Sequence, residues 1–305
     1  MATNFSHLPT QMPEPEGSYA LLTEDPEAAA VFVHGFRGHP RKSWFDFQGL
    51  IDELQGKFPA WGKCDLFFYS YPSHDQIKPL AENFLAFLIR LFPQYGTRGD
   101  FFGLRLPWQD FTLPSGRRII TRPIDTRQAY KRLILVGHST GALIIREAVL
   151  QTLRPLIASL DKTTWEKYLF ILNAFLRFFA PAHRGAMCAG PLGGVLHLPV
   201  SEWVLAFWLY SNPLFRNLQP GSPVLEDIRR ETEELQKTFP DIPALRASSL
   251  FGAKDVIVYM GKYKNDVDCP TEPWRTHTSV CKPRRDYIKP LEFVIDAIAG
   301  RATGL

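Results

Sequence analysis

Residues 133–141 read Leu-Ile-Leu-Val-Gly-His-Ser-Thr-Gly, and this stretch decides how the chain folds. Four apolar residues end in a Gly-x-Ser-x-Gly pentapeptide, and the helix-forming run Ala142–Ala148 follows it directly. The pattern predicts a buried strand, a tight turn and a helix in immediate succession. Gly137 and Gly141 would let the two backbones approach closely beside a strained serine. A turn without chemical meaning is the alternative, but the flanking strand and helix favour Ser139 as a nucleophile at a helix N-terminus.

The composition is that of a soluble, core-forming protein. Of 305 residues, 45% are hydrophobic and 22% charged, and the formal net charge is only +4. This slight charge, without a run of lysine or arginine, argues against a nucleic-acid partner. The markedly apolar segment at residues 200–210 is too short to be a transmembrane segment. Because the N-terminus lacks a basic-then-apolar signal pattern, we expect a cytoplasmic protein.

The four cysteines do not indicate a metal site. Cys64, Cys188, Cys269 and Cys281 lack the spacing of metal ligands, so zinc is not expected. Cys269 and Cys281 would be the candidate disulfide in an oxidising compartment, whereas reduced thiols are expected in a cytosolic protein.

From about residue 28 to 299 the chain resembles an α/β-hydrolase. The resemblance rests on the Gly-x-Ser-x-Gly stretch, on His34-Gly35 after an apolar strand, and on a His-x-Ser-x-Cys-Lys segment at 277–282. Within that superfamily the chain is most similar to the serine esterase and lipase-like branch that includes the GPI-inositol deacylases. The implied fold is α/β, with a mostly parallel central sheet flanked by helices and a helical lid or cap insertion.

The expected organisation is a flexible arm over residues 1–17 and a single α/β-hydrolase domain over 18–305. Two excursions interrupt it, at 94–131, where turn signals suggest a hairpin, and at 186–240, where the fold admits a lid. Strands are expected at 19–23, 28–33, 64–71 and 245–251, and helices at 43–58, 77–91, 153–176, 226–239 and 286–299.

A serine nucleophile needs a histidine base and a carboxylate to orient it. In the fold that the chain resembles, the acid follows the serine and the histidine comes last. Asp255 is the preferred acid because it follows the strand at 245–251 directly, where catalytic groups collect. It could also be a simple turn residue, and its rivals are Asp266, Asp268 and Asp241. His277 is the histidine that follows every acid candidate, so we assign it as the base.

The resemblance also implies an oxyanion hole. The backbone N–H groups of Phe36, after the His-Gly pair, and Thr140, after the nucleophile, would hold the oxyanion. His34 would brace the oxyanion loop, and His138 would pack under the nucleophile turn. His183, in a segment similar to the Thr-Pro-His-x-Gly turn of many lipases, is interpreted as structural.

The apolar run at 200–210 suggests either a lid helix over an acyl pocket or a plain packing helix. In the lid interpretation Trp203 and Phe207, together with His138, would contact the substrate.

We expect a serine hydrolase that cleaves small-molecule or lipid esters through an acyl-enzyme, with no metal or organic cofactor. An amidase, thioesterase or acyltransferase would use the same three residues. A non-catalytic, hydrolase-like interaction module, with 200–210 as its docking face, is the alternative from another class.

Overall fold

The computed structural model describes most of the chain: residues 8–12, 15–23, 25–44, 47–54, 56–93, 110–112, 118–120, 129–159, 162–186, 212–267 and 271–300. The predicted nucleophile strand, the oxyanion loop and all three expected catalytic residues lie within these ranges.

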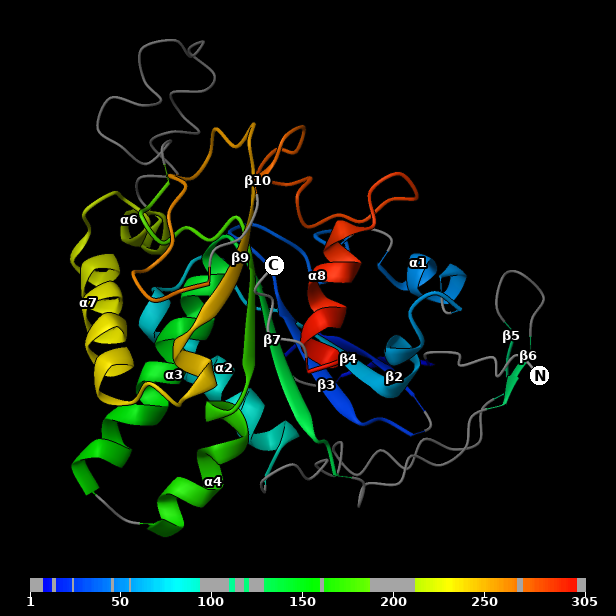
Figure 1. Ribbon diagram of the computed structural model, residues 1–305, viewed down its shortest axis with the longest axis horizontal. Coiled ribbons are helices and arrows are strands. Elements are labelled where there is room, and N and C mark those ends of the chain that lie inside the picture. The colour runs from blue at the N-terminus through cyan, green and yellow to red at the C-terminus, as the bar shows by residue number, and fades with distance from the viewer. Residues whose placement is uncertain are drawn as a thin grey trace.

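The centre of the molecule is an eight-stranded sheet with the order β1-β2-β4-β3-β7-β8-β9-β10 (Figure 1). Neighbouring strands from β4 to β10 are parallel, and β1 and β2 add an antiparallel edge. Every residue of β3 and β4 is buried, as expected for parallel strands that are covered on both faces. The strands are β1 (Leu8–Gln11), β2 (Tyr19–Leu22), β3 (Ala28–Val33), β4 (Cys64–Tyr69), β7 (Arg132–His138), β8 (Phe175–Phe179), β9 (Ala247–Gly252) and β10 (Thr271–Glu272).

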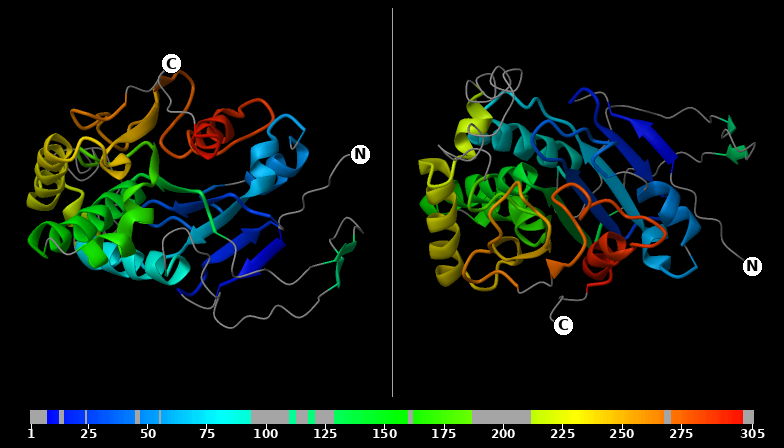
Figure 2. Two further views of the ribbon diagram at one scale, coloured as in Figure 1. Left: turned by 60° about the horizontal axis from the view of Figure 1, so that its bottom comes forward. Right: turned by 90° about the horizontal axis from the view of Figure 1, so that it is seen from above.

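Helices cover both faces of this sheet (Figures 1 and 2). One face carries α2, α3, α4 and α7, where α3 packs between α2 and α7, and the other face carries α1 and α8. This arrangement confirms the predicted fold class. The helices are α1 (Phe47–Glu53), α2 (Ile77–Leu91), α3 (Thr140–Ser159), α4 (Lys162–Leu172), α6 (Pro213–Asn217), α7 (Pro223–Thr238) and α8 (Lys289–Ile298), with short 3₁₀ helices at Pro59–Lys63 and Pro243–Leu245.

Local sequence explains where the helices lie and begin. In α2, apolar residues recur every three or four positions and form one buried face, which packs on α3. At the start of α7 the Ser222 side chain accepts a hydrogen bond from a backbone N–H of the first turn, and Pro223 occupies the first helical position. Gly221 precedes them with φ +74°, which glycine adopts without strain.

The structure differs from expectation at the N-terminus. Leu8–Gln11 pair with β2, so part of the expected arm is a strand and Tyr19–Leu22 is not the edge of the sheet. Four residues that include Pro9 carry no alternating pattern, and proline is tolerated in a strand because this one lies at the edge.

Two of the expected helices also have different bounds. The helix expected at 43–58 is shorter, since α1 spans only Phe47–Glu53. The helical signals at 153–176 belong to two helices, the end of α3 and the whole of α4, and the last residues of that range begin β8.

Within the first excursion, β5 (Asp110–Thr112) and β6 (Arg118–Ile120) form an antiparallel pair, which confirms the predicted hairpin. Residues 187–211 of the second excursion, with the proposed lid run at 200–210, lie outside the described residues, and α6 and α7 form its later part. Among the helices that the structure describes, none combines the length and the apolar character needed to cross a bilayer.

Candidate active site

Ser139 occupies a single-residue junction between the end of β7 and the start of α3. Its φ is +53°, a conformation that a serine adopts only under constraint from its surroundings. A Cβ at Gly137 would lie 2.7 Å from backbone atoms of the first turn of α3, and one at Gly141 would lie 2.2 Å from a carbonyl oxygen of β3. Both glycines are therefore required for the close approach that the sequence predicted.

Backbone hydrogen bonds hold the Ser139 turn in place. The Ser139 N–H donates to the carbonyl of Phe179 at the end of β8, at 3.0 Å. The Ser139 carbonyl accepts from Ala142 at 3.2 Å and from Ala182 at 3.4 Å. The serine is thus tied to the first turn of α3 and to the loop after β8, and only 6% of its surface is exposed.

Asp255 and His277 meet through a side-chain hydrogen bond. The Nδ1–H of His277 donates to Oδ2 of Asp255 at 2.9 Å, and both residues are buried. The other carboxylate oxygen accepts the backbone N–H groups of Ile257 and Val258 at 2.9 and 3.1 Å. Burial raises the pKa of Asp255, but the hydrogen bond and charge of His277 and the two N–H donors outweigh it, so the pKa lies below its usual value.

The backbone after β9 is joined to the loop that carries His277. The N–H of Lys254 donates to the carbonyl of Arg275 at 3.0 Å, and that of Ala253 donates to the carbonyl of Glu272 at 2.8 Å. At Gly252 a Cβ would lie 2.3 Å from the Arg275 carbonyl oxygen, so only glycine fits there. These contacts bring the acid and the histidine together from loops 22 residues apart.

Ser139 and His277 line the same cavity of about 430 Å³. Gly35 and Phe36 of the loop after β3 also line it, and a Cβ at Gly35 would lie 2.9 Å from the Ser139 Cβ. Thr140 is the first residue of α3, so its N–H is among those with no acceptor inside the helix. Both expected oxyanion donors therefore belong to backbone that borders the serine.

Two further histidines support this region in neutral form. His138 lines the cavity, and its Nε2–H donates to the carbonyl of His277 at 2.9 Å. Burial lowers the pKa of His138 to about 3. His34 stacks on Tyr71 at 4.3 Å between ring centroids, and its Nδ1–H donates to the Gly35 carbonyl at 2.9 Å. Burial lowers the pKa of His34 to about 4, so its imidazole is neutral near pH 7. The hydrogen bond from His34 to Gly35 stabilises the loop that carries Phe36.

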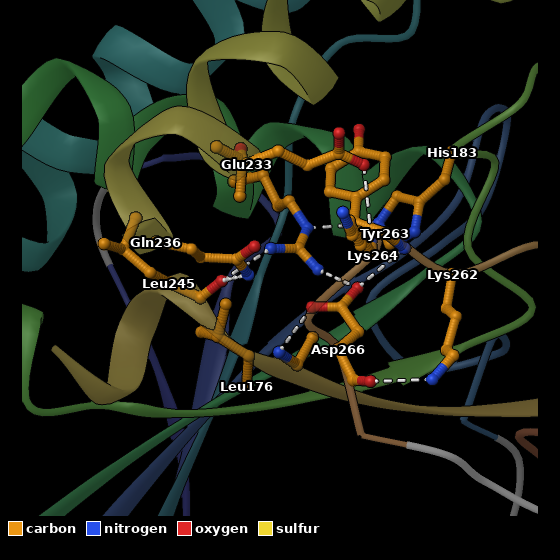
Figure 3. Close-up of polar contacts among 12 residues, drawn as sticks. Leu176, His183, Glu233, Gln236, Leu245, Lys262, Tyr263, Lys264 and Asp266 are labelled. Atoms are coloured by element: carbon orange, nitrogen blue, oxygen red, sulfur yellow. Dashed lines mark hydrogen bonds and ion pairs between the residues drawn. The ribbon is translucent and has the colours of Figure 1, made fainter. Parts of the chain in front are cut away.

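Asp266, a rival acid, lies in a separate buried cluster (Figure 3). Its carboxylate pairs with Arg146 of α3 and accepts the backbone N–H of Ala247 at 2.9 Å. Arg146 also donates to Nε2 of His183 at 3.3 Å, and His183 stacks on Tyr263 at 4.3 Å between ring centroids. Burial holds the pKa of His183 well below its usual value. Asp266 and His183 thus both contact Arg146, whereas the carboxylate that pairs with His277 is Asp255.

The remaining expected residues are placed as follows. Asp241 is exposed before β9, and Asp268, Trp203 and Phe207 lie outside the described residues. Cys64 and Cys281 are both buried, Cys281 as a free thiol, and Cys188 and Cys269 are not among the described residues. In the part of the chain that the structure describes, no three His, Cys, Asp or Glu side chains are grouped to hold a metal ion.

Sequence reasoning missed several residues of the cavity wall. Phe215 and Leu218 come from α6 and the turn after it, and Ile257 and Val258 come from the loop after Asp255. The signal for the second pair was their position directly after the expected acid. The first pair lies just beyond the apolar run that was expected to form the lid.

Comparisons with known proteins agree with this fold. A model of the alpha/beta hydrolase family matches residues 30–283. Among solved structures, the propeptide form of lipase BlEst2 from Bacillus licheniformis is 16% identical with a TM-score of 0.50, and the match covers 95% of this chain and 53% of that one. The mature form is 16% identical with a TM-score of 0.49, covering 94% and 95%. Est1E from Butyrivibrio proteoclasticus is 14% identical with a TM-score of 0.45, covering 97% and 96%.

At 16% identity the likeness to the propeptide form shows the fold alone. No curated protein matches the chain significantly in sequence. The narrower resemblance to GPI-inositol deacylases stays a prediction. The family match spans most of the chain and includes the strands from β4 to β10, the Ser139 turn and the His277 loop, so the chain belongs to the alpha/beta hydrolase family.

Proposed function

We propose that this protein is a serine hydrolase that cleaves carboxylic esters, with Ser139, His277 and Asp255 as its catalytic triad. One observation carries the proposal. A strained serine, Ser139, and a histidine, His277, line one cavity. The Nδ1 atom of this histidine is hydrogen-bonded to the buried carboxylate of Asp255. A serine, a histidine and a carboxylate in this order are the groups that activate a hydroxyl for attack on a carbonyl. Ester cleavage is also in keeping with membership of the alpha/beta hydrolase family.

In the first half of the proposed reaction, Ser139 Oγ attacks the ester carbonyl carbon and its proton passes to Nε2 of His277. The carbonyl π electrons move to oxygen, and the backbone N–H groups of Phe36 and Thr140 stabilise the resulting charge. Asp255 stabilises the imidazolium through the 2.9 Å hydrogen bond. The intermediate then collapses, the alcohol leaves with the proton from Nε2, and the acyl group stays on Ser139.

In the second half, water enters and His277 removes its proton as the oxygen attacks the acyl carbon. The same oxyanion site holds the second intermediate. Ser139 Oγ leaves and takes the proton back from Nε2, which restores the starting state and releases the acid. The cycle balances without a metal or an organic cofactor.

A cytoplasmic location is part of the proposal. Cys281 is a buried free thiol, which fits a reducing compartment. Burial raises the pKa of Cys281 to about 12, so this thiol in the cavity wall stays protonated and does not compete with Ser139 as a nucleophile.

The test is hydrolysis of p-nitrophenyl esters from acetyl to palmitoyl by wild type and by Ser139→Ala, with circular dichroism and a urea midpoint to confirm that the variant is folded. We expect ester turnover by the wild type and a loss of about 10⁵-fold or more in kcat for the variant. Turnover that survives in folded Ser139→Ala contradicts the mechanism.

The same experiment separates the alternatives. If the folded wild type cleaves amides or thioesters but no ester, the triad stands and the substrate class is wrong. Transfer of the acyl group to an added alcohol in preference to water would indicate an acyltransferase. If no substrate is turned over and Ser139 does not react with a fluorophosphonate, the protein is a hydrolase-like interaction module.

A further inference from the structure

The cavity around Ser139 has one apolar wall. Its side chains come from the loop after β8, from α6 and the turn that follows, and from the loop after Asp255. These segments are joined to one another. The N–H of Ala186 donates to the carbonyl of Leu218 at 2.8 Å, and Ala186 forms an antiparallel bridge with Val258. The apolar residues of this wall are Ala182, Ala186, Phe215, Leu218, Ile257 and Val258.

A second wall is cationic. It is built from the loop after β3, with Arg37 and Lys42, and from the loop after His277, with Lys282. Cys281 connects the two loops, because its thiol lies 3.5 Å from the Ser43 carbonyl oxygen. The two lysines are therefore held at the same cavity although 240 positions separate them in the chain.

The lysines of this wall have no carboxylate partner within the described part of the chain. Lys42 is exposed and Lys282 is half-buried, and neither forms an ion pair with any residue that the structure describes. Among the described residues that line the cavity there is no aspartate or glutamate. Uncompensated positive charge at the wall of a concave site raises the local concentration of anions and favours their binding.

Ser139 borders both walls. Gly35, at the start of the cationic loop, approaches the serine so closely that a Cβ there would lie 2.9 Å from the Ser139 Cβ. On the other side, Ala182 of the apolar wall donates its N–H to the Ser139 carbonyl at 3.4 Å. An ester whose carbonyl lies at Ser139 therefore lies in a cavity lined by both an apolar surface and the two lysines.

We propose that the site takes acyl esters whose alcohol carries an anionic group, a phosphate in particular, and that Lys42 and Lys282 determine this specificity. The acyl chain lies on the apolar wall, and the phosphate lies against the two lysines. The inference rests on the proposed ester hydrolysis and goes beyond it, since the triad alone does not distinguish charged from neutral alcohols.

The test compares two substrates that differ only in the phosphate: 1-octanoylglycerol 3-phosphate and 1-octanoylglycerol, both below the concentration at which they form micelles. Monomeric substrates exclude attraction to a charged lipid surface as the cause of a difference. The measured quantity is the ratio of kcat/KM for the phosphate ester to kcat/KM for the neutral ester. The proteins are wild type, Lys42→Gln, Lys282→Gln, the double variant and Lys237→Gln.

Lys237 is the matched control because it is an exposed lysine in the last turn of α7 and does not line the cavity. We expect the wild type to prefer the phosphate ester by about tenfold or more. Replacing either cavity lysine by glutamine should lower the ratio by about fivefold. This corresponds to the loss of roughly 1 kcal/mol of attraction between two charges in contact with water. The ratio should fall with added salt, and Lys237→Gln should retain the wild-type ratio.

A wild-type ratio at or below one, with Ser139-dependent cleavage of the neutral ester, overturns this inference and leaves the ester hydrolase intact. A high ratio that both lysine substitutions leave unchanged overturns the assignment of Lys42 and Lys282. If the folded protein cleaves neither ester nor any p-nitrophenyl ester, the proposed function fails, and the inference fails with it.

Discussion

Replacing Asp255 by asparagine tests the role of the buried carboxylate with little change of shape. The introduced amide can keep one oxygen in place to accept the N–H groups of Ile257 and Val258, which the carboxylate accepts at 2.9 and 3.1 Å. Its NH₂ group then faces Nδ1 of His277 at the position where Oδ2 of the carboxylate lies 2.9 Å away. The imidazole must turn its Nδ1 lone pair toward this donor, so its proton moves to Nε2. In that tautomer His277 cannot take the proton of Ser139.

The expected loss in kcat is about 10³- to 10⁴-fold. A charge separation of about 4 Å at an effective dielectric constant of about 20 corresponds to roughly 4 kcal/mol of lost imidazolium stabilisation, or about 10³-fold in rate. The unfavourable tautomer increases the loss, and removal of the carboxylate charge from a Ser-His-Asp triad lowers kcat by about 10⁴-fold.

The assay is kcat for the best p-nitrophenyl ester, with the urea midpoint as a check on folding. Asp241→Asn is the matched control, because it makes the same chemical change at an exposed carboxylate before β9. It should keep the wild-type rate. A folded Asp255→Asn protein within tenfold of the wild-type kcat would refute the reasoning from the hydrogen-bond geometry.

Three further predictions concern stability, each measured by urea unfolding. Gly141→Ala should lower the unfolding free energy by about 2 kcal/mol or more, because its Cβ would lie 2.2 Å from a carbonyl of β3. Gly56→Ala, whose Cβ would meet nothing within 4 Å, should change it by less than about 0.5 kcal/mol; equal effects would contradict the packing argument. Arg146→Met should destabilise by about 3–5 kcal/mol, since Asp266 would stay buried without its partner, and adding Asp266→Asn should recover part of this; a stable single variant would argue against the ion pair. Folding lowers the pKa of His138 from 6.5 to about 3, so the unfolded chain binds more protons and stability falls as pH falls below 6.5. At pH 5 His138 should account for about 2 kcal/mol of this fall, and His138→Gln should remove that share; an unchanged pH dependence would speak against a buried neutral imidazole.

The Ser139 turn could be predicted because its determinants are local. A strand, two glycines and a helix lie within about fifteen consecutive residues. Each of them indicates the local backbone conformation directly from its residue types. The alternation of apolar strands and amphipathic helices likewise indicated the parallel sheet. The edge strand β1 was missed because four residues with a proline carry no periodic signal.

The sequence favoured Asp255 over the other acids only by its position directly after the strand at 245–251. Asp255 and Asp266 both follow β9 in loops of similar character. What distinguishes them is tertiary. Arg146 of α3 reaches Asp266, and the loop that carries His277 is hydrogen-bonded to the backbone next to Asp255.

The walls of the cavity depend on contacts between distant segments, which periodicity does not encode. Lys42 and Lys282 are brought to one cavity only by the packing of two loops, and Phe215 and Ile257 share its apolar wall although they come from α6 and from the loop after β9. In the sequence, the apolar run with Trp203 and Phe207 was easier to recognise than these wall residues. A run of apolar residues does not, however, identify the surface that it covers.

The most direct test of the central claim, that Ser139 is the nucleophile, is reaction of the native protein with a fluorophosphonate, followed by peptide mass spectrometry. The account predicts one adduct, on Ser139, that does not form in Asp255→Asn at the same rate and is absent after unfolding in urea. A folded protein that stays unlabelled, or that is labelled at another residue while Ser139 stays free, would contradict it.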